Sequence, residues 1–273
     1  MKVAVLGSGS RGNAILVEGN GTRVLVDAGF SARDLARRLE RVEVAPDSLA
    51  GIVVTHDHAD HTRGMGVFAR RFGTPLYLTA GTREACARLL RGQEEVRRYQ
   101  AGRPFMVGGL RVEPFPTVHD AREPVGVALV DPDAGARLGV ATDLGRPSAG
   151  IRHALAGCHI LVLEANHDDL LLQDAPYPWS VKARIRSSHG HLSNRAAGRF
   201  AQELHHPELL AVVLAHLSTE SNRPEMARRA VAGALAEVGY RGVLTVADQD
   251  EPLPVLDVGE LRRRRDPGQL ALL

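Results

Sequence analysis

The sequence has little cysteine and none of the spacings in which cysteine usually carries chemistry. Its 273 residues include two cysteines, Cys86 and Cys158, and no CxxC motif. This excludes a disulfide framework and a thiolate metal site. Isolated thiols beside apolar runs are typical of buried residues in a reducing compartment.

Long apolar segments are also lacking. The N-terminal segment MKVAVLG reaches glycine after a handful of apolar residues. This is too short for a signal-peptide core, and no later run approaches the length of a membrane span. No segment indicates an obligate protein partner. We therefore expect a cytoplasmic protein with no membrane segment.

The net charge is small, +2, and the isoelectric point is about 8.7. This excludes a protein that binds nucleic acid over its whole surface, so any such affinity must come from a local patch. Hydrophobic and charged fractions of 44% and 24% are ordinary globular values. We expect one domain over residues 1–273, with a basic tail at about 262–273 that is solvated rather than a binding arm.

The hydrophobic pattern predicts an α/β fold. Three Gly-bounded, β-rich segments at 2–7, 13–19 and 22–29 favour antiparallel strands, and Ser31 caps a helical pattern that follows them. After a short strand at 51–55, strands and helices alternate to the C-terminal part. Two strand-rich halves with helices outside predict a four-layer αβ/βα sandwich.

The segment THDHADH places four potential metal ligands, His56, His58, Asp60 and His61, directly after the strand at 51–55. Two histidines two residues apart on extended backbone project to the same side. The turn after them can aim Asp60 and His61 into a neighbouring space, so the loop can serve two adjacent metals. The alternative is a polar surface loop with chance histidines, which four ligands in six residues disfavour.

Three further candidates, His119, Asp143 and His216, each follow a predicted strand. Alone, each could be a capped or hydrogen-bonded residue, and Asp143 could simply start a turn. Together with the THDHADH loop they complete two coordination shells at one edge of the sheets.

This pattern resembles the five-motif metal site of the metallo-β-lactamase superfamily. The resemblance implies that His56, His58 and His119 hold a first metal, that Asp60, His61 and His216 hold a second, and that Asp143 bridges them. It also implies a structural role for Asp27. Six further segments are similar to the YycJ/WalJ-type branch of exonuclease-like bacterial proteins: GSGSRGN (7–13), HDAREPVG (119–126), EANHD (164–168), YPWSVKARI (177–185), GHLSN (190–194) and AHLSTESNRPE (215–225).

Nitrogen and carboxylate ligands without cysteine suit two divalent ions, either zinc or manganese, with iron also compatible. Two such ions can share a bridging hydroxide, aim it in line and neutralise phosphoryl charge, which makes Asp60 and Asp143 the candidate catalytic residues. We expect a phosphodiester hydrolase, an exonuclease that acts on DNA, with RNA as a second candidate substrate. The alternatives are a hydrolase of small phosphodiesters, thioesters or lactones, and a non-catalytic metal-stabilised scaffold, which the full ligand set disfavours.

Two segments are candidates for binding the substrate. In GHLSN, Ser193 is placed to cap a helix beside His191 and Asn194, which together form an anion site. The alternative is that Ser193 is only a cap and His191 a surface residue. Downstream of Tyr177 and Trp179, the basic residues Lys182, Arg184 and Arg186 predict phosphate contacts next to stacked bases, or else a merely solvated helix face.

Overall fold

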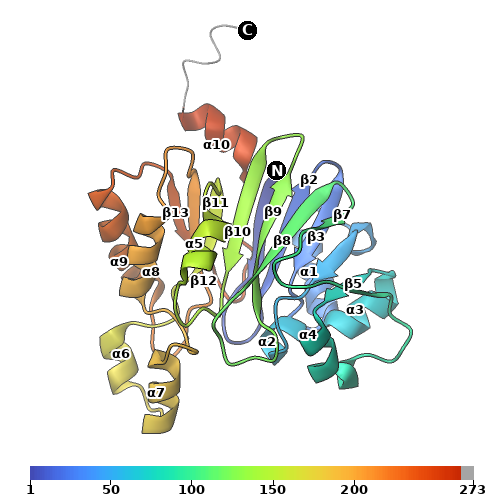
Figure 1. The fold of residues 1–273 in the computed structure, drawn as a ribbon, viewed down its shortest axis with the longest axis horizontal. Helices are drawn as coiled ribbons and strands as arrows, with labels where there is room; N and C mark the ends of the chain where they lie inside the picture. The colour runs from blue at the N-terminus through green and yellow to red at the C-terminus, as the bar shows by residue number, and fades with distance from the viewer. Residues whose placement is uncertain (266–273) are drawn as a thin grey trace, which may run out of the picture.

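The computed structural model describes residues 1–265, and the chain folds into two seven-stranded sheets packed face to face with helices outside them (Figure 1). The first sheet has the order β14 (Leu256–Asp257), β1 (Lys2–Gly7), β2 (Ala14–Gly19), β3 (Thr22–Val26), β4 (Gly51–Val53), β5 (Leu76–Leu78) and β6 (Val96–Arg98). The second has the order β13 (Val243–Val246), β12 (Ala211–Ala215), β11 (Ile160–Glu164), β10 (Ala136–Ala141), β9 (Val125–Asp131), β8 (Leu110–Pro116) and β7 (Phe105–Val107).

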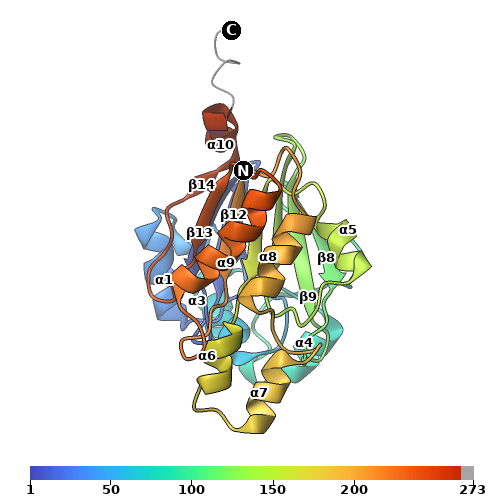
Figure 2. The same ribbon diagram turned by 90° about the vertical axis from the view of Figure 1, so that its left-hand side faces the viewer.

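Helices cover both outer faces. The first sheet is covered by α1 (Ala32–Arg41) and α3 (Met65–Phe72), and the short α2 (Ala59–Thr62) and α4 (Ala80–Ala85) follow its strands. The second sheet is covered by α5 (Ala149–Leu155), α8 (Asn194–Glu203) and α9 (Pro224–Glu237). Three elements extend outward: α6 (Asp169–Asp174), α7 (Trp179–Arg186) and α10 (Val258–Arg265) (Figure 2).

The burial pattern explains the layers. Helix α1 begins after Ser31, whose side chain accepts a hydrogen bond from the Asp34 amide, and it buries Leu35 and Leu39, which are one turn apart on the same face. A central core fills the space between the sheets, and one further apolar cluster lies under the helices on each side. The predicted four-layer sandwich is confirmed.

Strand direction creates a site at one edge. The first three strands are antiparallel, as predicted, but β3, β4, β5 and β6 run parallel, and so do β10, β11, β12 and β13. Parallel strands end at the same edge of a sheet. In Figure 1 this edge lies at the bottom, opposite the N-terminus and α10.

Several elements differ from the sequence-based expectation. The predicted helix after β5 ends at Ala85 and continues only as a 3-10 turn, while β7, β14, α6 and α10 were not expected. The start of the tail was predicted too early, at residue 262. Residues 262–265 belong to α10, and Arg262 donates hydrogen bonds to the carbonyl oxygens of Ala134 and Gly135. The remainder of that tail lies outside the described residues. Within the described part, no helix has the length and apolar character needed to cross a membrane.

Candidate metal centre

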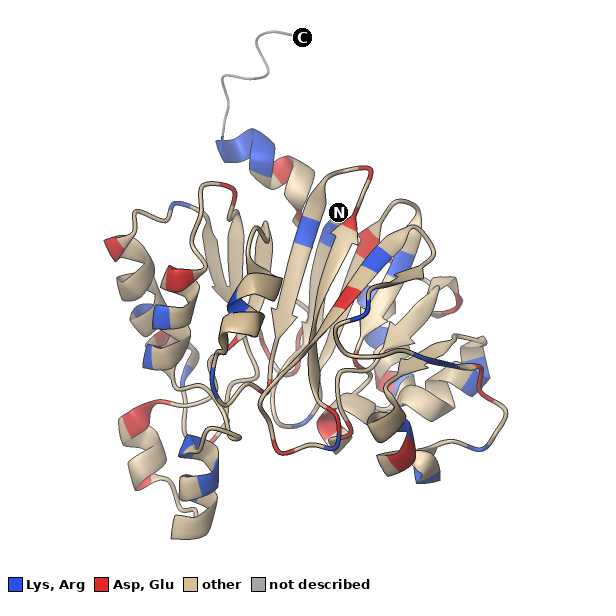
Figure 3. Cartoon of the chain, viewed as in Figure 1, with Lys and Arg blue, Asp and Glu red and all other residues tan. Residues whose placement is uncertain are grey.

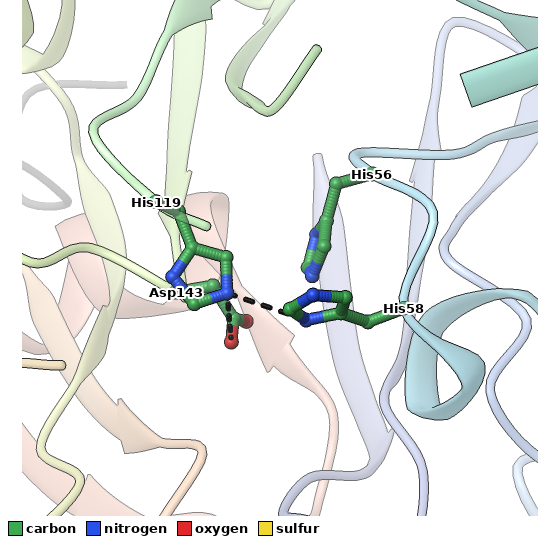
Figure 4. A group of neighbouring side chains, drawn as sticks. All are labelled: His56, His58, His119 and Asp143. Atoms are coloured by element: carbon green, nitrogen blue, oxygen red, sulfur yellow. Dashed lines mark hydrogen bonds and ion pairs between the residues drawn. The ribbon is translucent and has the colours of Figure 1, made fainter. Parts of the chain in front are cut away.

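The THDHADH loop turns sharply after β4 and directs its histidines inward. His56 and His61 are almost fully buried, and His58 stands immediately before α2. His56 and His58 meet His119 and Asp143, which arrive from the second sheet, and Figure 4 shows the four side chains pointing toward one another. The donor atoms of this first group all lie within 4.8 Å of one another.

A second group forms beside the first. It contains Asp60, His61 and His216, again with all donor atoms within 4.8 Å. Asp143 touches both groups: its Oδ1 lies 3.6 Å from His119 Nε2 and its Oδ2 lies 3.1 Å from His61 Nε2. All seven residues named from the sequence are therefore brought together, with Asp143 between the two groups.

The backbone is bent to achieve this. Asp27, Asp143 and His216 each follow a strand and have positive φ values of 63°, 56° and 54°. This left-handed conformation costs a non-glycine residue of order 1–3 kcal/mol, and it persists where surrounding contacts over-determine it. The turn aims each side chain across the sheet edge instead of along the strand.

Each histidine has one ring nitrogen held from outside the centre. His61 Nδ1 donates to Asp27 Oδ2 (2.8 Å) and His216 Nδ1 to Glu164 Oε1 (3.0 Å), while His119 Nδ1 donates to the Gly190 carbonyl (3.2 Å). His58 Nε2 donates to the carbonyl of Asp120 (3.2 Å). Such outer partners fix the tautomer of each neutral imidazole. The other ring nitrogen is then unprotonated, and its lone pair faces the centre.

When the imidazoles are neutral, the inward-facing atoms are therefore acceptors that face acceptors. His119 Nε2 lies 3.3 Å from His58 Nδ1, and His216 Nε2 lies 3.2 Å from Asp60 Oδ2. The buried atoms His56 Nε2 and Asp143 Oδ2 have no hydrogen-bond partner among the described residues. Lone pairs at these spacings repel unless a cation lies between them, so the donor set fits a metal ion, with imidazole and carboxylate as its ligands.

The pKa shifts also show that the centre favours positive charge. Burial by itself would lower the pKa of His61, but Asp143 and Asp27 outweigh burial and hold that pKa well above its usual value. Despite burial, the pKa of Asp143 lies well below its usual range because His216 and His61 stabilise the carboxylate. In contrast, burial and His61 lower the pKa of His56, which keeps its imidazole neutral.

Glu164 is the main residue that the sequence analysis missed. It ends β11, is fully buried, and accepts hydrogen bonds from the amides of Asp143, Leu144 and Leu192 and from the imidazoles of His191 and His216. These contacts hold its pKa at about 2 although burial alone would raise it. A single carboxylate at the end of the otherwise apolar strand ILVLE was the available signal, since the other strand-end ligands share that position.

The N-terminal loop GSGSRGN also supports the centre. Asn13 Nδ2 donates to the backbone carbonyl and to Oδ2 of Asp60, and Ser8 Oγ accepts the His216 amide. Gly29, after β3, packs against the THDHADH loop, because a Cβ there would lie 1.6 Å from the Asp60 carbonyl oxygen. Asp27 accepts hydrogen bonds from Thr55 and His61, as a supporting aspartate would.

The centre opens into a cleft of about 310 Å³. Of the predicted substrate-binding residues, His191 and Arg184 line this cleft, together with Tyr177. Lys182 and Arg186 instead donate to backbone carbonyls of Gln173 and Asp169 on α6. Figure 3 shows these basic residues gathered on α7, below the sheet edge.

The GHLSN loop is divided between two roles. Ser193 caps α8 by accepting the Ala196 amide, as predicted. Asn194 is buried and its amide pairs with the Asn222 amide, a structural contact rather than an approach to the cleft. His191 donates from Nδ1 to Glu164 Oε1 at 2.7 Å.

Comparison with known proteins agrees with this geometry. Residues 22–216 match the model of the β-lactamase superfamily domain. The chain is 34% identical to exodeoxyribonuclease YycJ of Bacillus anthracis over 92% of this chain and 96% of that protein. It is 31% identical to exodeoxyribonuclease WalJ of Streptococcus pneumoniae, over 86% and 88%.

The fold is also shared with a solved structure. The metallo-β-lactamase fold protein YhfI from Bacillus subtilis aligns with a TM-score of 0.71 and 18% identity, covering 92% of this chain and 98% of that one. The chain therefore belongs to the β-lactamase superfamily, in the same family as the exodeoxyribonucleases YycJ and WalJ.

Proposed function

We propose that this protein is a metal-dependent exonuclease that hydrolyses phosphodiester bonds in DNA. The observation that carries the proposal is the two clusters of histidine and aspartate ligand atoms that meet at Asp143. They lie at a cleft that is also lined by Arg184 and His191. The two exodeoxyribonuclease relatives support DNA as the substrate.

The proposed centre takes two divalent ions, either zinc or manganese, with iron also compatible with the donors. His56, His58 and His119 would hold the first and Asp60, His61 and His216 the second, with Asp143 shared between them. Bound ions would lower the pKa of a water molecule and neutralise charge on the phosphoryl oxygens. Asp60 and Asp143, as the carboxylates of the centre, orient the reacting groups.

We infer that His191 protonates the leaving oxygen. Its Nδ1 is committed to Glu164, so Nε2 is the ring atom available on the cleft side. Burial would lower the pKa of His191, but the adjacent Glu164 carboxylate outweighs burial and raises it. An imidazolium of this kind keeps a proton at Nε2 for the departing 3′ or 5′ oxygen. The proposed role differs from the simple phosphate contact expected from the sequence.

Arg184 and Tyr177 would contact the strand beside the scissile bond. Arg184 is two-thirds exposed and lies at the cleft, where a guanidinium can bind a neighbouring phosphate. Tyr177 offers a ring on which a terminal base can stack.

The test is hydrolysis of end-labelled single-stranded and duplex DNA, with RNA of the same sequence alongside, by the metal-free chain supplied with Mn²⁺ or Zn²⁺. We expect stepwise release of mononucleotides from DNA and none with Asp143→Asn. Hydrolysis of small phosphodiesters or thioesters without release of nucleotides from any polymer would contradict the proposal. If only RNA is shortened, the substrate would be RNA and not DNA.

A further inference from the structure

Helix α7 has an apolar face that the fold itself does not bury. None of its residues is fully buried. Val181 and Ile185 lie one turn apart on the same face and both line the cleft, as does Tyr177, four residues before Val181. All three side chains remain partly exposed to solvent. These three residues, the apolar wall, form one side of a cleft whose other side is the metal centre.

The rest of α7 holds the apolar wall in place. On the opposite face, Lys182 and Arg186 donate hydrogen bonds to backbone carbonyls of α6. At the end of the helix, the Ile185 carbonyl accepts the His191 amide at 2.9 Å. Gly190 makes this approach possible, because a Cβ there would lie 2.3 Å from the same carbonyl oxygen. The apolar wall is therefore formed before any ligand binds, and it lies beside His191.

The size and charge of the cleft define what can cover the apolar wall. A volume of about 310 Å³ is near the lower end of the range for small-molecule sites, roughly 300–1,000 Å³, so the cleft holds about one nucleotide and not a base pair. Arg184 adds a cation to the cleft, whereas the wall has no charged side chain. A nucleotide matches both features, because its phosphate is anionic and its base is flat and uncharged.

We propose that the apolar wall binds the base of the terminal nucleotide, which is therefore unpaired when it is cleaved. The proposal rests on the exonuclease function proposed above and adds the form of its substrate, a strand end that is single or has opened. Because the cleft has no room for the opposite base, a terminal base pair has to open first. Opening costs free energy, and the cost is least at a mismatched or single-stranded end.

The first test varies the pairing at the substrate end. Release of the terminal nucleotide is measured with Mn²⁺ from duplexes whose two ends are matched, mismatched or cross-linked between the terminal bases. We expect release from matched ends to be about tenfold slower than from mismatched ends, and no release from cross-linked ends. Equal rates from matched and cross-linked ends would overturn the proposal.

The second test removes the wall and the base in turn. Ile185→Ala should lower kcat/KM about tenfold on a single-stranded oligonucleotide, because apolar contact with the base is lost. On the same oligonucleotide with abasic terminal residues it should lose almost nothing, because no base remains to be contacted. Val181→Ala should show the same difference with a smaller loss. Equal losses on both oligonucleotides would mean that the wall contacts something other than the base, and would contradict the proposal.

Leu170→Ala is the matched control. Leu170 is an exposed apolar residue on the neighbouring helix α6 and does not line the cleft. This variant should keep wild-type rates on both oligonucleotides. A loss confined to the normal oligonucleotide, as large as that of Ile185→Ala, would show that the effect is not specific to the apolar wall.

Two small diesters separate this inference from the exonuclease function. Thymidine 5′-p-nitrophenyl phosphate has a base, whereas methyl p-nitrophenyl phosphate has none. Ile185→Ala should lose activity on the first and keep it on the second, and equal losses would overturn base binding by the wall. A chain that cleaves both diesters but releases no nucleotide from DNA would refute the exonuclease function, which is a different result.

Discussion

At Asp143 the backbone conformation decides which substitution is informative. Its φ of 56° is tolerated better by asparagine than by alanine, because short polar side chains stabilise the left-handed conformation. Asp143→Asn should therefore fold like the wild type and lose most of its bound metal and all detectable turnover. Elemental analysis of the purified variant, with circular dichroism for the fold, measures both. A variant with full metal content and undiminished activity would contradict the shared position of Asp143.

His191 can be tested separately from the metals by the choice of leaving group. General acid catalysis contributes roughly 10²–10⁴-fold when the departing oxygen needs a proton. His191→Ala should lose about that factor in kcat/KM on DNA but little on thymidine 5′-p-nitrophenyl phosphate, because nitrophenolate leaves without protonation.

The control for this experiment is the neighbouring exposed residue His189, whose ring hydrogen-bonds only to Ser188 among the described residues. His189→Ala should retain activity on both substrates. Equal losses on both substrates in His191→Ala, or a loss of metal, would show that His191 acts as a ligand or as a phosphate contact instead.

The sequence predicted the residues of the centre better than its supporting contacts. His56, His58 and Asp60 stand in one recognisable loop, and the distant candidates stand at strand ends. Glu164 occupies a strand end too, but its role depends on β11 lying between β10 and β12, which places it between Asp143 and His216. Strand order is a tertiary property that a single sequence does not specify.

The prediction that Lys182, Arg184 and Arg186 form one basic surface did not take account of the geometry of helix α7. Residues two apart on a helix do not share a face, whereas residues four apart do. Lys182 and Arg186 accordingly lie together against α6, and Arg184 lies on the cleft side, near Asp120. The contact surface on the cleft side therefore contains one of the three basic residues.

This arrangement predicts unequal effects of substitutions on α7. Arg184→Ala should raise KM for oligonucleotides about ten- to a hundredfold and flatten the dependence on salt, because one charge-assisted phosphate contact is lost. Lys182→Ala is the matched control and should change KM little. Similar increases in the two variants would indicate a diffuse basic surface and contradict the assignment to Arg184. The measurement is steady-state kinetics at several salt concentrations.

Elements with weak sequence signals were the ones missed. Helix α6 has six residues and begins at the cap Asp168, too short for a clear period, and α10 ends in four consecutive arginines that mask its two buried residues, Val258 and Leu261. The predicted elements of the core have strong signals: β1 to β3 are nearly continuous apolar runs bounded by glycine, and α1 has helical periodicity. Local pattern therefore sufficed for the layers and failed for the α6–α7 segment beside the cleft.

On the scale of the whole molecule, the metal centre joins the two halves of the sandwich. His56, Asp60 and His61 follow the first sheet, whereas His119, Asp143 and His216 follow strands of the second. Any ion bound by both sets links the sheets at this edge in the folded state only. An unfolded chain cannot present these donors together, so metal binding is added to the free energy of unfolding.

Removal of metal should therefore lower the melting temperature. A ligand at about 100 times its Kd adds roughly 2.7 kcal/mol to stability, and for a chain of this size each kcal/mol shifts Tm by roughly 2–4 °C. We expect Tm to fall by roughly 5–10 °C when the chelated protein is compared with protein in excess Zn²⁺ or Mn²⁺. Asp143→Asn should show a much smaller difference, because in the proposed centre both ions share its carboxylate. Scanning calorimetry measures the effect, and equal shifts in the wild type and the variant would mean that the stabilising ion binds elsewhere.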